Sequence, residues 1–303
     1  MKAVFVDANP ALSAVADKLH RPGKFELAVN RNPDIKPADL PGLLKGAAVA
    51  IVDHTAVPTE IAKSIPGLKH VVFLGTGARS YMNPEELAAC GIGVHTIKGY
   101  GDTAVAECAF GLMFAAAKGV ARMDGGMRAG QWLRTDGVQL TGKTVGLLGY
   151  GGIAAEFARL ARGIGMRVIA WNRTKRTAEG VEFVDLSELL AQSDVLSIHL
   201  LLTDETRGFL NRERIAAMRK GAILINTARG AIVDETAMIE ALGTGQLRHA
   251  GLDVFEIEPL PVGHRLTKVE NVTLSAHSAF RTPEANENLI GAAFAHCDRI
   301  AAG

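Results

Sequence analysis

Cysteine is scarce in this chain of 303 residues, which contains only Cys90, Cys108 and Cys297. The three lie far apart, form no Cys-x-x-Cys pair and have no histidine beside them at metal-ligand spacing. A disulfide framework and a zinc site are therefore not expected, and no metal is predicted. We expect three buried thiols in a protein of a reducing compartment.

Charge of one sign and long apolar runs are also lacking. Lys and Arg total 33 against 32 Asp and Glu, so a net charge of +1 gives no global field for nucleic acid or an anionic membrane. The longest apolar run, residues 108–117, is about half a membrane span. Residues 1–7 put a carboxylate directly behind a short apolar run, which is typical of a first strand and not of a secretory leader. We expect a cytoplasmic protein with a small-molecule partner, and no nucleic-acid or membrane partner.

What the sequence does contain is a regular alternation of short β-rich runs and helical stretches, in a chain long enough for two domains. The predicted strands of the first third are residues 3–6, 25–29, 48–52, 70–74 and 92–95. A second series contains strands at 144–148, 167–171, 195–198, 222–226, 249–252 and 272–274. Both series predict parallel sheets, and the second matches a doubly wound nucleotide domain.

Two further segments organise the chain. A long apolar-rich helix over residues 104–118 leads into a polar segment, 122–132, that is punctuated by glycines and that we interpret as a bridge between domains. A last helix begins at Thr282-Pro283, with an N-cap residue followed by proline at the first helical position, and runs to Ala302. It is predicted to pack back on the N-terminal domain.

The most specific motif is a glycine-rich turn between the strand at 144–148 and a predicted helix at 153–164. Gly149 allows the tight turn, Gly151 lets the backbone approach a pyrophosphate, and Ala154 is small enough for the helix to pack close to the strand. The amide groups at the helix start then face the phosphates. The turn predicts a dinucleotide site; the alternative is a glycine-rich turn that binds no ligand.

The end of the next strand bears on the kind of dinucleotide. NAD sites usually carry Asp or Glu about 20 residues beyond the turn, where this chain has Asn172, followed by Arg173-Thr174-Lys175-Arg176. Cations and a hydroxyl then stand where a 2′-phosphate would lie. We predict NADP(H) as the preferred cofactor, with NAD possible. The alternative is a solvated basic loop that tolerates both cofactors.

Three polar residues, Arg229, Glu258 and His277, follow later strands of the second series, where such a sheet builds its ligand site. Hydride transfer to a ketone leaves charge on its oxygen, so a positioned acid must donate a proton, and histidine has the nearest pKa. Glu258 would favour the imidazolium of His277 and hold its tautomer. Arg229 can clamp a substrate carboxylate and polarise the ketone. The alternatives are that His277 is a core histidine, that Arg229 forms a surface ion pair and that Glu258 is a turn residue before proline.

In combination these motifs resemble the D-isomer-specific 2-hydroxyacid dehydrogenase family over nearly the whole chain. The residues that carry the resemblance are 148–154, 226–235, 252–255 with Glu258-Pro259, and His277. The resemblance implies an α/β fold in which a Rossmann doubly wound nucleotide domain, residues 99–282, is inserted in a flavodoxin-like α/β substrate domain, residues 1–98 plus 283–303. It also implies the same catalytic roles, and a homodimer formed through an arm at about residues 119–140.

Wider sets of contacts follow from the resemblance. The expected cofactor-binding residues are Thr76, Thr103, Gly149, Tyr150, Gly151, Gly152, Ile153, Asn172, Arg173, Thr174, Lys175, Leu200, Thr227, Ala228, Arg229, Asp253, His277 and Ala279. The expected substrate-binding residues are Leu74, Gly75, Thr76, Gly77, Arg79, Arg229, His277 and Arg281. In the second set, the glycines permit close approach of backbone amides to a substrate carboxylate.

Three residues keep two interpretations each. Arg79 either reaches the substrate tail or is a solvated turn residue. Arg281 is either a second carboxylate contact or a charge near a helix cap. Trp132 either enters the partner subunit's site or packs in the dimer interface.

We therefore expect an NADPH-preferring reductase of a short 2-keto acid, such as glyoxylate or hydroxypyruvate, that forms the D-2-hydroxy acid where the product is chiral. One alternative is an NAD-linked dehydrogenase of the 3-phosphoglycerate type, against which Asn172 and Arg173 argue. The other is a dinucleotide-sensing protein like the C-terminal binding protein corepressors, against which the absence of long disordered tails argues.

Overall fold

The computed structural model describes all 303 residues, which divide into two compact units. Unit 1 consists of Met1–Gly101 and Arg281–Gly303, and unit 2 of Asp102–Phe280. These limits differ by two or three residues from the expected 98/99 and 282/283. The first limit falls where a long helix begins at Asp102, and Arg281 already belongs to unit 1.

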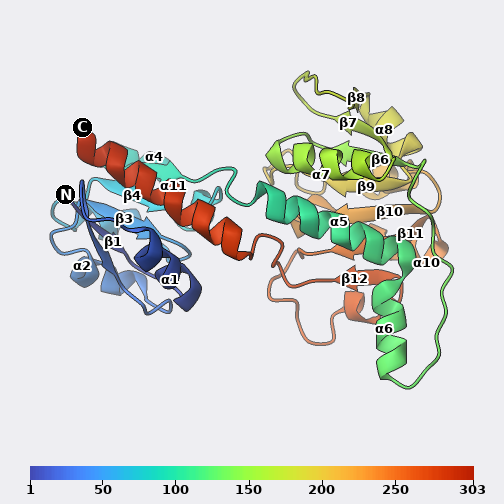
Figure 1. Cartoon of the computed structure of the whole chain (residues 1–303), viewed down its shortest axis with the longest axis horizontal. Helices are drawn as coiled ribbons and strands as arrows, with labels where there is room; N and C mark the ends of the chain where they lie inside the picture. Colours follow the sequence, from blue (N-terminus) through green and yellow to red (C-terminus); the bar gives the residue numbers. More distant parts are fainter. The chain divides into compact units, whose positions relative to one another are not determined.

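Unit 1, which contains β1, β3 and β4 of Figure 1, is built on a five-stranded parallel sheet with the order β2-β1-β3-β4-β5. This order is that of flavodoxin-like domains, the class predicted for the substrate domain. The strands are β1 (Lys2–Phe5), β2 (Glu26–Val29), β3 (Val49–Val52), β4 (His70–Phe73) and β5 (Gly93–Thr96). The helices are α1 (Pro10–Leu19), η1 (Pro37–Asp39), α2 (Leu40–Leu43), α3 (Thr59–Lys63), η2 (Ala78–Ser80), α4 (Pro84–Ala89) and α11 (Pro283–Ala302).

Helix α11 packs beside α1, as predicted for the last helix (Figure 1). The Thr282 side chain caps its start by accepting a hydrogen bond from the amide of Ala285. Its buried side chains Leu289 and Ile290 join one apolar cluster with Phe5 of β1. The last residues of the chain, which follow unit 2 in the sequence, thus complete the core of unit 1.

Unit 2 contains a seven-stranded parallel sheet with the order β12-β11-β10-β9-β6-β7-β8. The strands are β6 (Thr144–Leu148), β7 (Arg167–Trp171), β8 (Glu182–Phe183), β9 (Val195–Ile198), β10 (Ala222–Asn226), β11 (Leu247–Leu252) and β12 (Val272–Leu274). The helices are α5 (Asp102–Lys118), α6 (Val120–Arg128), α7 (Gly152–Gly163), α8 (Leu186–Gln192), α9 (Arg212–Ala216), η3 (Gly230–Ile232), α10 (Glu235–Thr244) and η4 (Arg265–Lys268). The predicted Rossmann arrangement is confirmed. Among the strands of unit 2, only the two-residue β8, too short for a periodic signal, was not predicted.

The strand order of unit 2 reverses between β6 and β9. In doubly wound sheets, ligands bind beyond the carboxyl ends of the strands at this reversal. The fold of unit 2 therefore places a candidate dinucleotide site after β6.

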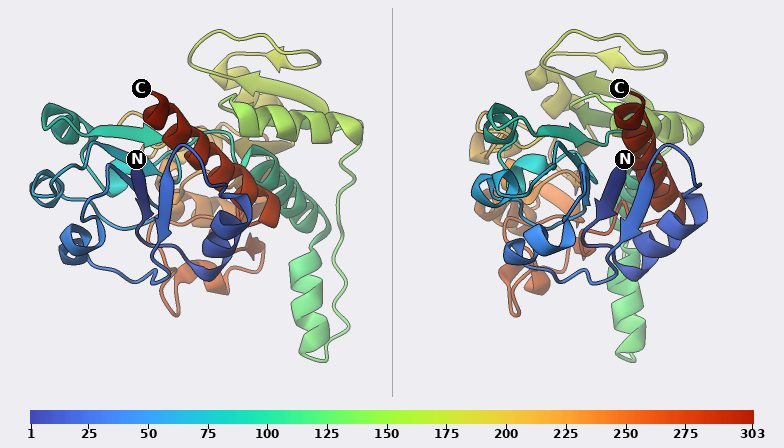
Figure 2. Two further views of the ribbon diagram at one scale, coloured as in Figure 1. Left: turned by 60° about the vertical axis from the view of Figure 1, so that its left-hand side comes forward. Right: turned by 90° about the vertical axis from the view of Figure 1, so that its left-hand side faces the viewer.

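The segment that follows α5 is not the bridge between domains expected from its sequence, because α6 belongs to unit 2. Gly119, with φ +66°, separates α5 from α6. Figure 2 shows α6 and the extended residues after it projecting as an arm from the rest of unit 2. Trp132 on this arm is 77% exposed.

The cysteines only partly follow the prediction of buried thiols. Cys297 is buried, Cys108 is half-buried and Cys90 is exposed. The structure contains no group of three or more His, Cys, Asp or Glu side chains arranged to hold a metal ion. No single helix has the length and hydropathy of a membrane span, although α5 and α6 together reach them as a pair bent by 68°.

Two buried histidines of unit 2 predict how stability depends on pH. Burial lowers the pKa of both His199 and His249 to about 4. Above about pH 6.5, the ordinary pKa of histidine, the two side chains are neutral in the folded and in the unfolded chain. Between about pH 6.5 and pH 4 they take up protons in the unfolded chain but not in the folded one. The free energy of unfolding should therefore fall with pH over this range, by on the order of 2–3 kcal/mol per histidine.

Urea unfolding at about pH 7 and about pH 5 checks this expectation. His249→Gln should remove roughly half of the pH dependence, since it removes one of two such groups. The Nε2 of His249 contacts the Thr273 hydroxyl at 2.9 Å, an interaction that glutamine can replace. Equal stabilities at both pH values would contradict the assignment of neutral buried histidines.

Candidate active site

The glycine-rich turn joins β6 to α7. Gly149 has φ +94°, and a Cβ there would lie 2.9 Å from the carbonyl oxygen of His199, so both the backbone conformation and the space require glycine. A Cβ on Gly151 would meet nothing within 4 Å. The approach to the first turn of α7, whose amides have no partner within the helix, is therefore open. This cradle fits a pyrophosphate.

Gly152 is required for a reason that the motif does not predict. A Cβ at this position would lie 1.8 Å from Oδ2 of Asp102, the first residue of α5. The Asp102 carboxylate thus lies beside the start of α7, and burial, followed by the charge of Glu156, raises its pKa. Sequence did not single out Asp102, because only the packing of α5 on α7 brings it to the turn.

The Asn172 side chain, which follows β7, forms two hydrogen bonds with nearby backbone groups. Its Oδ1 accepts a hydrogen bond from the amide of Tyr150 (3.1 Å), and its Nδ2 donates to the carbonyl of Thr174 (2.8 Å). Asn172 therefore ties the glycine turn to the basic loop. Within that loop Arg173 donates to Glu205 at 2.7 Å, a partner that the sequence pattern did not indicate.

Further members of the expected cofactor set lie at the carboxyl ends of β9 and β10. Thr227 and Ala228 follow β10, and Leu200 follows β9. The Thr227 hydroxyl is buried and has no hydrogen-bond partner. An unsatisfied buried hydroxyl here is consistent with a polar ligand group at this edge of the sheet.

His277 and Glu258 come together as the sequence predicted. Nδ1 of His277 lies 2.5 Å from Oε2 of Glu258, while the other carboxylate oxygen accepts from the amide of Phe255 at 2.8 Å. Both side chains are about one-third exposed. Glu258 thereby holds Nδ1 and leaves Nε2 as the ring nitrogen that can exchange a proton with a substrate.

Asp253 holds the loop that carries His277. Its carboxylate is fully buried and accepts from the Ser275 hydroxyl at 2.6 Å and from the amides of Ser278 and Ala279 at 3.1 and 3.0 Å. The amide of His277 donates to the Asp253 carbonyl at 2.7 Å. His277 is the only residue other than glycine with positive φ, at +47°. Asp253 therefore stabilises an unfavourable backbone conformation at the proposed acid.

Arg229 lies after β10 on a turn held by Asn226, whose side chain accepts from the amide of Ala228 and donates to the carbonyl of Arg229. Arg229 is exposed and has no carboxylate partner. Strands β10, β11 and β12 are neighbours in register, so the loops that carry Arg229, Glu258 and His277 follow adjacent strand ends. Unit 2 thus collects a cation, a carboxylate and a histidine at one edge.

In unit 1 the expected substrate loop, residues 74–77, follows β4. Gly75 has φ +155°, and the loop is tied to residues after β5 by a bond from the amide of Ile97 to the Gly75 carbonyl. Thr76 is exposed. Arg79 is also exposed, and its guanidinium is paired with Glu85.

A neighbouring loop of unit 1 was not singled out from the sequence. The buried carboxylate of Asp7 accepts hydrogen bonds from the amides of Asp53, His54 and Thr55 after β3. Nδ1 of His54 lies 3.3 Å from Asp53. Burial and then Asp7 raise the pKa of Asp53, which His54 and Arg281 oppose, so Arg281 also lies close enough to act on this loop. The sequence did contain a sign of this loop, because the carboxylate of Asp7 directly follows the first strand.

The chain is similar to known dehydrogenases and reductases. Residues 110–279 match the family described as D-isomer specific 2-hydroxyacid dehydrogenase, NAD binding domain. The chain is 41% identical to a glyoxylate reductase of Aeropyrum pernix, over 75% of this chain and 72% of that one, and 38% identical to a hydroxypyruvate reductase of Thermotoga maritima, over 78% of each. A solved structure of an acyclic imino acid reductase (Bsp5) with NADPH and D-Arg superposes with a TM-score of 0.84 at 29% identity, over 96% of this chain and 94% of that one. The chain therefore belongs to the D-isomer-specific 2-hydroxyacid dehydrogenase family and is an NAD(P)-dependent oxidoreductase.

Proposed function

We propose that this protein reduces a short 2-keto acid, such as glyoxylate or hydroxypyruvate, with NADPH as the preferred cofactor, and forms the D-2-hydroxy acid where the product is chiral. The observation that carries the proposal is the contact between His277 and Glu258 beside the strand end that bears Arg229. The names of the glyoxylate and hydroxypyruvate reductases among the relatives support the substrate class.

Each polar side chain has a separate task in this reaction. When bound, the nicotinamide supplies the hydride. His277 donates a proton from Nε2 to the developing alkoxide, and Glu258 accepts from Nδ1–H and stabilises the imidazolium. Arg229 binds the substrate carboxylate and polarises the keto oxygen. For unit 1, we retain the proposal that the backbone amides of residues 74–77 receive a substrate carboxylate.

A panel of short 2-keto acids, each assayed with NADPH and with NADH, tests substrate and cofactor together. We expect glyoxylate or hydroxypyruvate with NADPH to be turned over at an ordinary enzyme rate, about 1 s⁻¹ or faster. Turnover below about 0.01 s⁻¹ on every keto acid would favour the dinucleotide-sensing alternative.

The NADPH preference rests on the loop after β7. Asn172 supplies no carboxylate to bind a ribose hydroxyl or repel a 2′-phosphate, and its side chain is committed to the backbone of the loop. Glu205 orients the Arg173 guanidinium and partly neutralises its charge. Because both side chains are largely exposed, their pairing is weak, and a 2′-phosphate can compete for Arg173. The NADPH complex of the imino acid reductase shows that a protein of similar fold takes this cofactor.

Arg173→Ala should weaken NADPH use roughly 10- to 150-fold and spare NADH, because one charged hydrogen bond to the 2′-phosphate is lost. Glu205→Gln should do the opposite and lower the KM for NADPH about twofold to fivefold, because Arg173 loses a competing anion. Steady-state kinetics with each cofactor measure both effects. Arg212→Ala, which removes an exposed arginine paired with Glu240 on other helices of unit 2, is the control. Equal losses with NADPH and NADH in the Arg173 variant would contradict the assignment of Arg173 to the 2′-phosphate.

We also propose a homodimer formed through the arm at about residues 119–140. The arm exposes Val120, Met127 and Trp132, an apolar set unusual for a surface in contact with water. Trp132 then packs in the interface or enters the partner's site. Sedimentation equilibrium should give twice the chain mass of 32.0 kDa, and Trp132→Glu should shift the protein toward monomer. A wild-type protein that is monomeric at micromolar concentration would contradict the proposal.

A further inference from the structure

The segment from Phe255 to His264 carries Glu258 and has few links to the rest of unit 2. Its own hydrogen bonds are mostly internal, such as the bond from the His264 amide to the carbonyl of Pro261. Ile257 and Val262 are exposed and contribute little packing. Phe255 packs against the core of unit 2, and beyond it two polar side-chain pairs connect the segment to other elements, Glu258 with His277 and His264 with Glu235. The position of Glu258 therefore depends on how the ends of the segment are held.

The beginning of the segment is held by backbone packing against Gly230. A Cβ on Gly230 would lie 2.0 Å from the carbonyl carbon of Phe255 and 2.4 Å from the amide nitrogen of Glu256. Such close approach leaves no room for movement in that direction. The start of the segment and the turn that carries Arg229 are thus in direct contact.

The far end is held by His264. Its Nε2 lies 3.4 Å from Oε1 of Glu235, the first residue of α10, and both side chains are about one-fifth exposed. Its Nδ1 accepts from the amide of Leu266, a core residue, so the ring proton is on Nε2 and faces the carboxylate. With its proton on Nε2 the ring is neutral, so the attraction is between Nε2–H and the Glu235 carboxylate. It is screened less than at the surface because the pair is mostly shielded from water.

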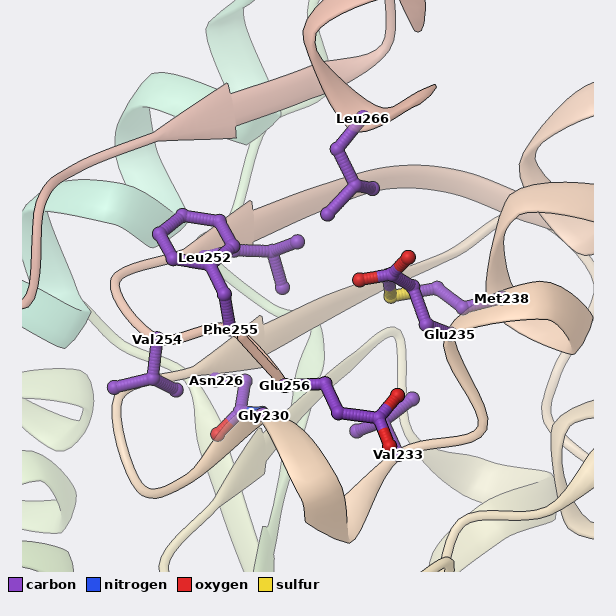
Figure 3. Close-up of a pocket in the computed structure, with 10 residues that line it drawn as sticks. All are labelled: Asn226, Gly230, Val233, Glu235, Met238, Leu252, Val254, Phe255, Glu256 and Leu266. Carbon is purple, nitrogen blue, oxygen red and sulfur yellow. The ribbon is translucent and has the colours of Figure 1, made fainter. Parts of the chain in front are cut away.

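The charges around this pair explain why it is needed. A small cavity of about 10 Å³ lies between α10 and the start of the segment, and both Glu235 and Glu256 line it (Figure 3). Burial raises the pKa of Glu235; Glu256 raises it further, whereas His264 and Arg265 lower it. Glu235 and Glu256 therefore repel each other. His264 and Arg265 offset that repulsion, and His264 is the one of the two that belongs to the segment.

We propose that Glu235 and His264 form a positioning pair for Glu258: by fixing the far end of the segment, they keep the Glu258 carboxylate on Nδ1 of His277. Without His264, the repulsion between Glu235 and Glu256 displaces the segment outward and lengthens the contact of 2.5 Å between Glu258 and His277. Glu258 then favours the imidazolium less. The inference rests on the proposed role of His277 as general acid.

The test is the pH profile of kcat for the wild type, His264→Ala and Glu235→Gln. His264→Ala should lower kcat about tenfold with the KM for NADPH nearly unchanged, and should move the alkaline limb of the reduction profile down by about half a pH unit, since less imidazolium is present at a given pH. Glu235→Gln removes the repulsion from Glu256 together with the pair, so its effect should be smaller, and it should partly restore kcat when combined with His264→Ala. His264→Gln, which keeps an N–H donor, should recover most of the activity. Glu240→Gln changes another carboxylate of α10, paired with Arg212, and should change none of these quantities.

Two further measurements decide between positioning and simple stability. In a Glu258→Gln background, His264→Ala should have no additional effect on kcat, because both act through the same contact. If the variants only lower the melting temperature and leave the pH profile unchanged, or if their effects add to that of Glu258→Gln, the proposal is overturned.

The NMR titration of the His277 ring in the protein without cofactor gives a readout independent of turnover. Its midpoint should be lower in His264→Ala than in the wild type. If no 2-keto acid is reduced but this midpoint moves, the proposed function fails and the positioning pair stands. If keto acids are reduced and the midpoint does not move, the positioning pair fails alone.

Discussion

Replacing His277 should lower kcat for 2-keto acid reduction by roughly 10²- to 10⁴-fold, because the transition state then lacks a positioned proton donor. Alanine would also change a position with φ +47°, so asparagine, which tolerates the left-handed conformation, is the better replacement. Single-wavelength assays of NADPH oxidation measure kcat, and fluorescence titration measures dinucleotide binding. In both the alanine and the asparagine variant, the loss in kcat should be much larger than any change in NADPH binding.

Glu258→Gln is the matched variant, since an amide keeps the shape but loses the charge that favours the imidazolium. We expect a smaller loss of kcat, about tenfold to a hundredfold, and an alkaline limb of the reduction profile that moves to lower pH. The sign follows because less of the acid is protonated at any given pH. Near-full turnover in either His277 variant on the best keto acid would show that another group supplies the proton.

Gly230→Ala should be nearly as damaging, although Gly230 has no side chain and takes no part in proton transfer. The added Cβ would lie 2.0 Å from the carbonyl carbon of Phe255, and backbone atoms cannot turn away as a flexible side chain does. Either the turn with Arg229 or the segment with Glu258 must shift. A displacement of about 1 Å at a catalytic group costs on the order of 100-fold in rate, so kcat/KM should fall by at least that factor.

Gly243→Ala is the control for this substitution. Gly243 lies in α10, and a Cβ there would meet nothing within 4 Å, so alanine should stabilise the protein by about 0.5–1 kcal/mol and leave kcat unchanged. Urea unfolding and steady-state assays on both variants give the comparison. Wild-type kcat/KM in Gly230→Ala would mean that the contact between the two backbones is not needed for catalysis.

Much of the architecture could be predicted because it depends on local patterns. The alternation of short apolar runs and helical stretches gave both parallel sheets, and the strand ends that converge in such a sheet brought Glu258 to His277. The interpretation of residues 122–132 as a bridge between domains was wrong, because the polar, glycine-containing pattern gave no sign of a helix that belongs to unit 2. Gly126 is nonetheless helical and packs where a Cβ would lie 2.9 Å from the Cβ of Leu133, so tertiary packing outweighed propensity.

The features that sequence did not predict are pairs between elements with no motif in common. Asp102 reaches Gly152 only because α5 packs on α7, and Glu205 reaches Arg173 across two loops 32 residues apart. The partner of His264, 29 residues earlier in the chain, is likewise set by how α10 packs on its sheet. Such contacts need the folded positions of whole elements, which periodicity and spacing do not supply.

The return of α11 to unit 1 also sets an order for folding during synthesis. All of Asp102–Phe280 leaves the ribosome before α11 does, so unit 2 can complete its core while unit 1 still lacks the helix that covers Phe5 and its neighbours. The nascent form of unit 1 therefore exposes apolar surface for the whole time that unit 2 is made. Chaperone binding during translation should concentrate on the first 101 residues and end when Leu289 and Ile290 emerge.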